Sequence, residues 1–205
     1  CECFKIKGGN TLNPAETVLN MKMHKAISVI QFKLEGQLLI RRKEFHMADR
    51  ALLDDINYEE GTIRLYGKEY NLLDHVFPTV DPENPYELSK EEEEVMERLV
   101  SAFANCEKLQ RHMQLLLKKG SLYKVYNNNL LYHGCVPLNE DGSFKEVEVY
   151  GRTYKGRELY DVLEAYVRKA FFALDKEEKQ RGRDILWFIW SSPSSPLFGK
   201  DKMAT

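Results

Sequence analysis

The pair His133-Gly134 has the residue types in this sequence that best suit metal chemistry. It lies in the apolar run over residues 130–136. A neutral imidazole is a good ligand for a divalent transition metal, and a place at the end of a strand holds its direction. The glycine removes side-chain bulk, so a metal or a phosphate could approach the backbone there. On these residues alone, the alternative is a buried histidine that hydrogen-bonds to a backbone carbonyl, with the glycine opening a turn.

Two lysines near the end of the sequence could contact a phosphate group. Lys200 and Lys202 follow Gly199 and the Ser/Pro-rich stretch 191–196. Lysines placed after a glycine can reach phosphate oxygens, and backbone N–H groups of such a loop can add hydrogen bonds. A solvated tail explains the same residues without any function, so both interpretations stay open.

The other potential ligands are weaker candidates. Four cysteines are too few for a disulfide framework in a chain of 205 residues, which favours a reducing compartment. Cys1 and Cys3 would need two further ligands to hold a metal, and none follows at a recognisable spacing. The remaining histidines fall in helical or loop-like stretches without an acid at ligand spacing: His24, His46, His75 and His112.

Two long helices are predicted in the first 120 residues. The first runs over residues 10–44, where Asn13 can cap and Pro14 suits the first helical position. The second runs unbroken over residues 89–119, with apolar residues at helical spacing. A capping box marks its start and a left-handed glycine its end: Ser89, Glu92 and Gly120.

Hairpins and two further helices are predicted around the histidine. Asparagine tolerates positive φ, so the three asparagines at 127–129 indicate a tight turn between strands 122–126 and 130–136. The second of these strands is apolar almost throughout, which is typical of a strand buried on both faces. The other predicted elements are a hairpin over 62–70 that turns at Gly67-Lys68, a hairpin over 144–154, and helices over 156–174 and 176–190.

Composition limits the classes of function. The net charge of −2 offers no case for nucleic-acid binding, and no stretch approaches the roughly 18 consecutive apolar residues that span a bilayer. Apolar residues make up 43% of the chain and charged residues 30%, as in ordinary globular proteins. Three prolines between residues 78 and 87 mark a connection, so a domain boundary is placed there.

Several long strings of the sequence resemble the bacterial class III fructose-1,6-bisphosphatases, which are calcineurin-like metallophosphoesterases. The resemblance is dense and in order from residue 88 to the end, and looser around residues 31–37. The strings that carry it are residues 105–112, 120–123, 130–144 and 184–205. The resemblance implies an α+β fold, in which this chain is a helix-rich segment of a layered β core with flanking helices.

The resemblance also implies a catalytic centre and a division of the chain. That centre would hold two metals, usually Mn²⁺, and a metal-bound hydroxide would attack the 1-phosphate of fructose 1,6-bisphosphate, a step of gluconeogenesis. His133 is the one residue that matches a metal ligand of the superfamily, and Lys200 and Lys202 could approach the sugar phosphates. Residues 1–87 would be a helical scaffold with a small hairpin, and residues 88–205 part of the phosphatase domain, incomplete at both ends.

The other ligands are therefore expected in polypeptide before residue 1 and after residue 205, and this segment alone is expected to be inactive. The predicted setting is cytoplasmic, with a sugar bisphosphate as substrate, no nucleic-acid or membrane partner, and a homo-oligomer possible through the helices. Two alternatives stay open: a metal-dependent phosphatase of another phosphoester or phosphoprotein, and a non-catalytic helical interaction module.

Overall fold

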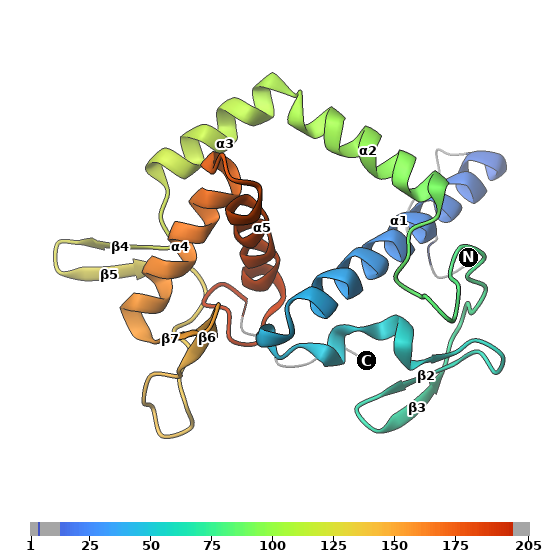
Figure 1. Cartoon of the computed structure of the whole chain (residues 1–205), viewed down its shortest axis with the longest axis horizontal. Coiled ribbons are helices and arrows are strands. Elements are labelled where there is room, and N and C mark those ends of the chain that lie inside the picture. Colours follow the sequence, from blue (N-terminus) through green and yellow to red (C-terminus); the bar gives the residue numbers. More distant parts are fainter. Residues whose placement is uncertain (1–3, 5–12, 199–205) are drawn as a thin grey trace. The chain divides into compact units, whose positions relative to one another are not determined.

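The computed structural model describes Phe4 and residues 13–198 (Figure 1). Its helices and small antiparallel sheets confirm the α+β class. The described residues form two compact units: residues 13–43 and 47–101 with Phe4, and residues 44–46 and 102–198. Among the described helices, none has the length and apolar character needed to cross a membrane.

The first unit is built on helix α1 (Pro14–Arg41), which starts where its capping residues predict. Asn13 Oδ1 accepts a hydrogen bond from Glu16 N at 2.9 Å, and Asn13 N donates to Glu16 Oε2 at 3.0 Å. The helix continues through Gly36, where a Cβ atom would lie 2.0 Å from Cδ1 of Tyr86. Gly36 therefore lets the buried Tyr86 ring lie directly on the helix.

Short elements follow α1 in the first unit. The predicted hairpin is confirmed, and its turn lies one residue earlier than predicted, at Tyr66-Gly67, with φ values of 50° and 78°. It belongs to a three-stranded antiparallel sheet in the order β1-β2-β3. The bounds are η2 (Lys43–Phe45), η3 (Ala48–Arg50), η4 (Leu52–Asp55), β1 (Ile56–Asn57), β2 (Thr62–Leu65) and β3 (Lys68–Asn71).

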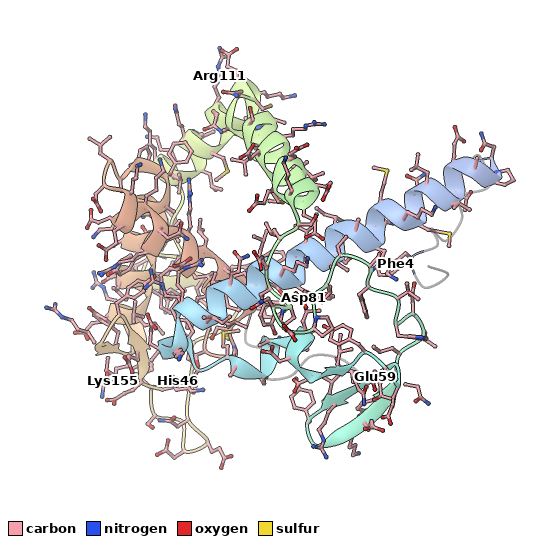
Figure 2. All side chains as sticks on the ribbon, turned by 45° about the vertical axis from the view of Figure 1, so that its right-hand side comes forward. Phe4, His46, Glu59, Asp81, Arg111 and Lys155 are labelled. Atoms are coloured by element: carbon pink, nitrogen blue, oxygen red, sulfur yellow. The ribbon has the colours of Figure 1, made fainter. Side chains whose placement is uncertain are left out.

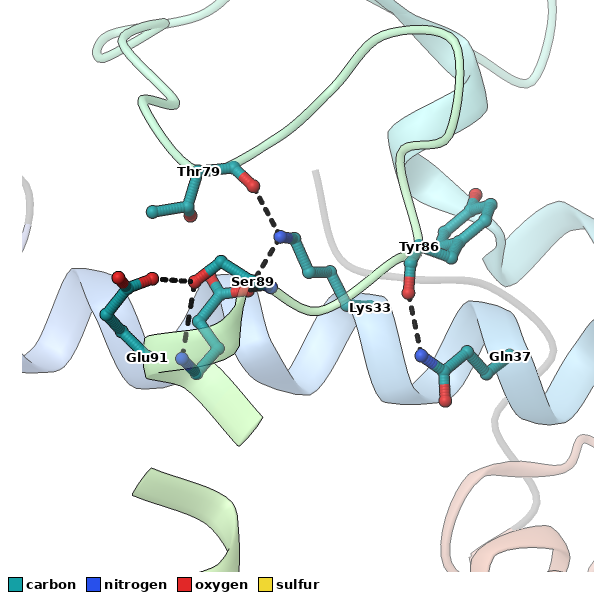
Figure 3. A network of polar contacts seen from close by, with 7 residues as sticks. Lys33, Gln37, Thr79, Tyr86, Ser89 and Glu91 are labelled. Carbon is teal, nitrogen blue, oxygen red and sulfur yellow. Dashed lines mark hydrogen bonds and ion pairs between the residues drawn. The ribbon is translucent and has the colours of Figure 1, made fainter. Parts of the chain in front are cut away.

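A buried lysine of α1 fastens the proline-rich connection to the helix (Figure 3). The Lys33 Nζ atom lies 2.7 Å from Glu92 Oε2 and donates to the carbonyl oxygen of Thr79 at 2.5 Å. Burial alone would raise the pKa of Glu92, but hydrogen bonds from Lys33, Thr79 and the Ser89 N–H hold that pKa below its ordinary value. One turn further along α1, Gln37 Nε2 donates a hydrogen bond to the backbone oxygen of Tyr86 at 2.8 Å.

The predicted unbroken helix over 89–119 is wrong. The structure has α2 (Lys90–Ala104) and α3 (Glu107–Lys119), and Cys106 has the extended backbone of an N-cap residue. At the break, the carbonyl oxygen of Phe103 accepts hydrogen bonds from the Cys106 N–H at 3.4 Å and from Gln110 Nε2 at 3.2 Å. The predicted left-handed cap is also wrong, since Gly120 has φ −79° and closes α3 by donating to Leu116 O.

The second unit packs around the helix pair α4 (Gly156–Phe172) and α5 (Lys176–Ser191), which lie side by side in Figure 1. Its core includes Leu159, Leu163 and Ile185, which are fully buried. Gly182 of α5 faces the backbone of α4, because a Cβ atom there would lie 2.3 Å from the Ala170 nitrogen. Two predicted hairpins precede these helices: β4 (Tyr123–Tyr126) with β5 (Asn129–Tyr132), and β6 (Val147–Val149) with β7 (Arg152–Tyr154).

Candidate functional site

His133 lies in the bend that follows β5, with its side chain exposed to solvent. The turn of the β4–β5 hairpin is the predicted one, because Asn127 and Asn128 both have positive φ, 48° and 58°. The prediction of a strand buried on both faces over 130–136 is wrong. Strand β5 ends at Tyr132 and every residue in it is exposed, and among the described strands it pairs with β4 alone.

Gly134 lets another group approach its backbone closely, as its residue type predicted. That group is the chain's own Ser/Pro loop, and not a metal or a phosphate. Its φ is +91°, and a Cβ atom there would lie 2.4 Å from the Pro196 oxygen. The next residue, Cys135, donates its N–H to the same oxygen at 2.9 Å. The backbone directly after His133 is thereby bound to the Ser/Pro loop, with 61 positions between Cys135 and Pro196 in the sequence.

The Ser/Pro loop is part of the core of the second unit. Ser192 and Ser195 are 1% and 0% exposed. The Ser195 hydroxyl donates to the carbonyl oxygen of Ile189 and accepts from the N–H of Leu197 at 3.0 Å. Lys200 and Lys202 lie outside the described residues, so their predicted role stays a prediction.

Helix α4 holds the other side of the site. Tyr160 donates its hydroxyl to the carbonyl oxygen of Cys135 at 2.8 Å, and burial raises the pKa of this phenol to about 12. Glu164 accepts from the Ser121 hydroxyl at 2.6 Å and from the Leu122 N–H at 2.9 Å, where β4 begins. One helix therefore fixes both the start of the hairpin and the segment that follows His133.

A second network ties the hairpin to the first turn of α4. Arg157 Nε donates to the Tyr123 hydroxyl at 2.9 Å, and this hydroxyl donates to Asp161 Oδ1 at 2.9 Å. The Arg157 guanidinium also lies 3.5 Å from Asp161 Oδ2. The positive charge of Arg157 is therefore balanced by Asp161 within the chain.

An apolar groove of about 240 Å³ lies between the hairpin and α4. None of its lining residues was among the predicted site residues. The signal that could have revealed it is the alternation of large apolar side chains along the two strands of the hairpin. The lining residues are Tyr123, Val125, Leu130, Tyr132, Val136, Phe144, Gly156, Arg157 and Tyr160.

The described residues do not by themselves form a metal centre. Within Phe4 and residues 13–198, no group of three or more His, Cys, Asp or Glu side chains is placed to hold a metal ion. The other histidines of the sequence are exposed. His46 (Figure 2), for example, lies 3.9 Å from Glu148 at the surface. His133 is thus one available donor, and its assignment as a ligand stays a prediction. Cys1 and Cys3 lie outside the described residues.

Comparison with known proteins covers the whole chain. Residues 1–205 match the family model described as Firmicute fructose-1,6-bisphosphatase. The fructose-1,6-bisphosphatase class 3 of Clostridium botulinum (strain Loch Maree / Type A3) is 54% identical over 207 residues, which cover 100% of this chain and 31% of that protein. The protein of the same name from Alkaliphilus metalliredigens (strain QYMF) is 52% identical over 210 residues, 100% of this chain and 32% of its own length.

The chain spans about a third of the length of these curated relatives. No solved structure matches it significantly. Because the family match extends over every residue, the resemblance that residues 105–112, 130–144 and 184–205 carry is confirmed. The chain belongs to the Firmicute fructose-1,6-bisphosphatase family.

Proposed function

We propose that this chain is part of a longer fructose-1,6-bisphosphatase that hydrolyses the 1-phosphate of fructose 1,6-bisphosphate in gluconeogenesis. The observation that supports the proposal is the match to this family over residues 1–205, with 54% identity to a protein named for this activity. Because the relatives are about three times as long as the matched region, the activity is assigned to the longer protein and not to these 205 residues alone.

His133 is proposed as one ligand of a two-metal centre, with Mn²⁺ as the metal and the remaining ligands in flanking polypeptide. Its position supports this, because the backbone of the residues after it is bound to the Ser/Pro loop and to Tyr160, while its own side chain is exposed. The described residues supply too few donors to hold a metal alone, so no catalytic step is assigned to them. Lys200 and Lys202 are proposed contacts of the sugar phosphates.

The proposed fold of the longer protein is that of the calcineurin-like metallophosphoesterases, and its proposed location is the cytoplasm. This chain would supply the His-Gly hairpin and the helices that fix it. The arrangement fits that role because α4, α5 and the Ser/Pro loop form one packed core behind an exposed histidine.

The test compares His133→Ala with His112→Ala in the full-length protein. His112 is an exposed histidine of α3 and serves as the matched control. Bound manganese is measured by mass spectrometry of the purified protein, and phosphate release is measured with fructose 1,6-bisphosphate and a panel of other phosphoesters. His133→Ala is expected to lose bound metal and to lose more activity than the about 10–100-fold typical of an outer-shell partner. His112→Ala should retain both.

Two results would overturn different parts of the proposal. Unchanged manganese content and activity in His133→Ala would reject the ligand assignment. Wild-type protein that releases phosphate from another ester but not from fructose 1,6-bisphosphate would reject the substrate and leave the metal assignment intact.

A further inference from the structure

One face of the β4–β5 hairpin carries only large apolar or aromatic side chains. Tyr123 pairs with Tyr132 and Val125 pairs with Leu130, so these four residues share a face, called here the apolar hairpin face. Three of them are strongly exposed: Val125 at 61%, Leu130 at 54% and Tyr132 at 47%. The same four residues form one wall of the groove beside α4.

The opposite face of the hairpin has a different composition. Lys124 pairs with Leu131, and Tyr126 pairs with Asn129. A lysine and an asparagine suit contact with water, whereas the apolar hairpin face has no charged or amide side chain. The two faces are nearly equal in exposure at their adjacent leucines, with Leu130 at 54% and Leu131 at 52%. The two faces therefore differ in the polarity of their side chains and not in their exposure to solvent, and the apolar hairpin face is the one expected to be buried by other polypeptide.

The groove is suited to apolar side chains of a protein segment. Its volume of about 240 Å³ falls below the roughly 300–1,000 Å³ of small-molecule pockets. Val136, Phe144 and Tyr160 complete the lining with apolar surface. The one cation at the groove among the described residues, Arg157, already pairs with Asp161 and donates to Tyr123, so an occupant needs no acidic group.

The hairpin itself is a reason to expect a cover. Its sheet has only two strands, and each of them has one edge without a partner among the described strands. A contiguous exposed apolar surface on such a sheet is typical of an interaction site. About two thirds of the length of each relative has no counterpart in this chain.

We propose that an apolar segment of the flanking polypeptide packs on the apolar hairpin face and fills the groove beside α4. The inference rests on the proposal that the chain is part of a longer protein, but not on its catalytic activity. The covered hairpin would leave His133 at the margin of the contact, so the packing would also fix the strand that presents this histidine.

The test uses hydroxyl-radical footprinting of the full-length protein, read residue by residue by mass spectrometry. Leu130 and Leu131 form a matched pair of the same residue type, adjacent in sequence and on opposite faces. Leu130 is expected to react several-fold more slowly than Leu131, while the two should react at equal rates in the urea-denatured protein. Leu130→Arg is expected to lower the melting temperature of the full-length protein, and Leu131→Arg to leave it nearly unchanged.

Two outcomes would overturn the inference. Equal reactivity of Leu130 and Leu131 in the native protein would show that neither face is covered. Protection of Leu130 that disappears on dilution, in step with dissociation of an oligomer, would assign the cover to a second copy. Neither measurement uses phosphate release, so a failed phosphatase assay and a failed footprint are separate results. The footprint of the wild-type protein decides the question even if Leu130→Arg does not fold.

Discussion

Replacing Gly182 with alanine tests whether α4 and α5 pack as closely as the structure shows. Gly182 lies in the middle of α5, where alanine normally stabilises a helix by about 1 kcal/mol relative to glycine. Here the new Cβ atom would lie 2.3 Å from the Ala170 nitrogen and 2.6 Å from the Tyr166 oxygen. Both obstacles are backbone atoms of α4, so no change of side-chain rotamer can relieve the contact.

The size of the effect follows from the separation that the alanine requires. Ordinary contact begins at 3.4 Å, so the two helices must move apart by about 3.4 − 2.3 = 1.1 Å at this point. A gap of 0.5–1 Å already removes about a quarter to a half of the dispersion energy of the atoms that face it. Overpacking typically costs about 1–3 kcal/mol, and a backbone obstacle favours the upper end. After the gain in helix propensity, we expect a net loss of about 2 kcal/mol.

Thermal unfolding followed by circular dichroism measures this loss. For a unit of about 100 residues, 2 kcal/mol corresponds to a fall of roughly 10 °C in the melting temperature. Arg183→Ala is the matched control, because Arg183 is the next residue of α5 and is exposed; its effect should stay within about 0.5 kcal/mol. A Gly182→Ala protein that is more stable than the wild type would show helix propensity acting alone and would refute the close contact.

Two further predictions concern the first unit. Glu92→Gln should lower the free energy of unfolding by about 3 kcal/mol at pH 7, because it leaves Lys33 buried without its carboxylate. The pKa of Glu92 is lower in the folded protein than its ordinary value of 4.5. The ionised carboxylate therefore stabilises the wild type fully above pH 4.5, and this stabilisation is lost as the pH falls through the folded pKa. Urea titrations should therefore show the gap between the two proteins closing from pH 7 toward pH 3, and a gap independent of pH would contradict the assignment. Gly36→Ala should destabilise the protein by about 1–3 kcal/mol, because its Cβ atom would overlap the buried ring of Tyr86. Gly36→Ala together with Tyr86→Ala should show strong coupling in a double-mutant cycle, and additive effects would argue against the contact.

Much of the secondary structure could be predicted from short stretches of sequence. Asn13 accepts the capping hydrogen bond from Glu16, and the asparagines at 127 and 128 take the positive φ values that their turn requires. Ser89 and Glu92 form their capping box. Such features depend on hydrogen bonds that span three or four residues, so the local sequence contains all the participating groups.

The helix break at Cys106 could not be predicted in the same way. Apolar positions keep a helical period across it, and both halves are good helices. At the break, the side chain of Gln110 reaches back seven residues to a carbonyl at the end of α2. Periodicity reports which face of a helix is apolar, but not whether the backbone bends between two compatible turns.

The sequence by itself determined the family, the capped helix ends, the hairpin turns and His133 as a metal-ligand candidate. Tertiary structure alone decided the surroundings of that histidine. Gly134 accommodates Pro196, two serines of the Ser/Pro loop are buried, and the hairpin has an apolar face beside α4. The reason is physical: these features join residues about 20 to 60 positions apart, and such contacts depend on how packed elements meet, which no local pattern specifies.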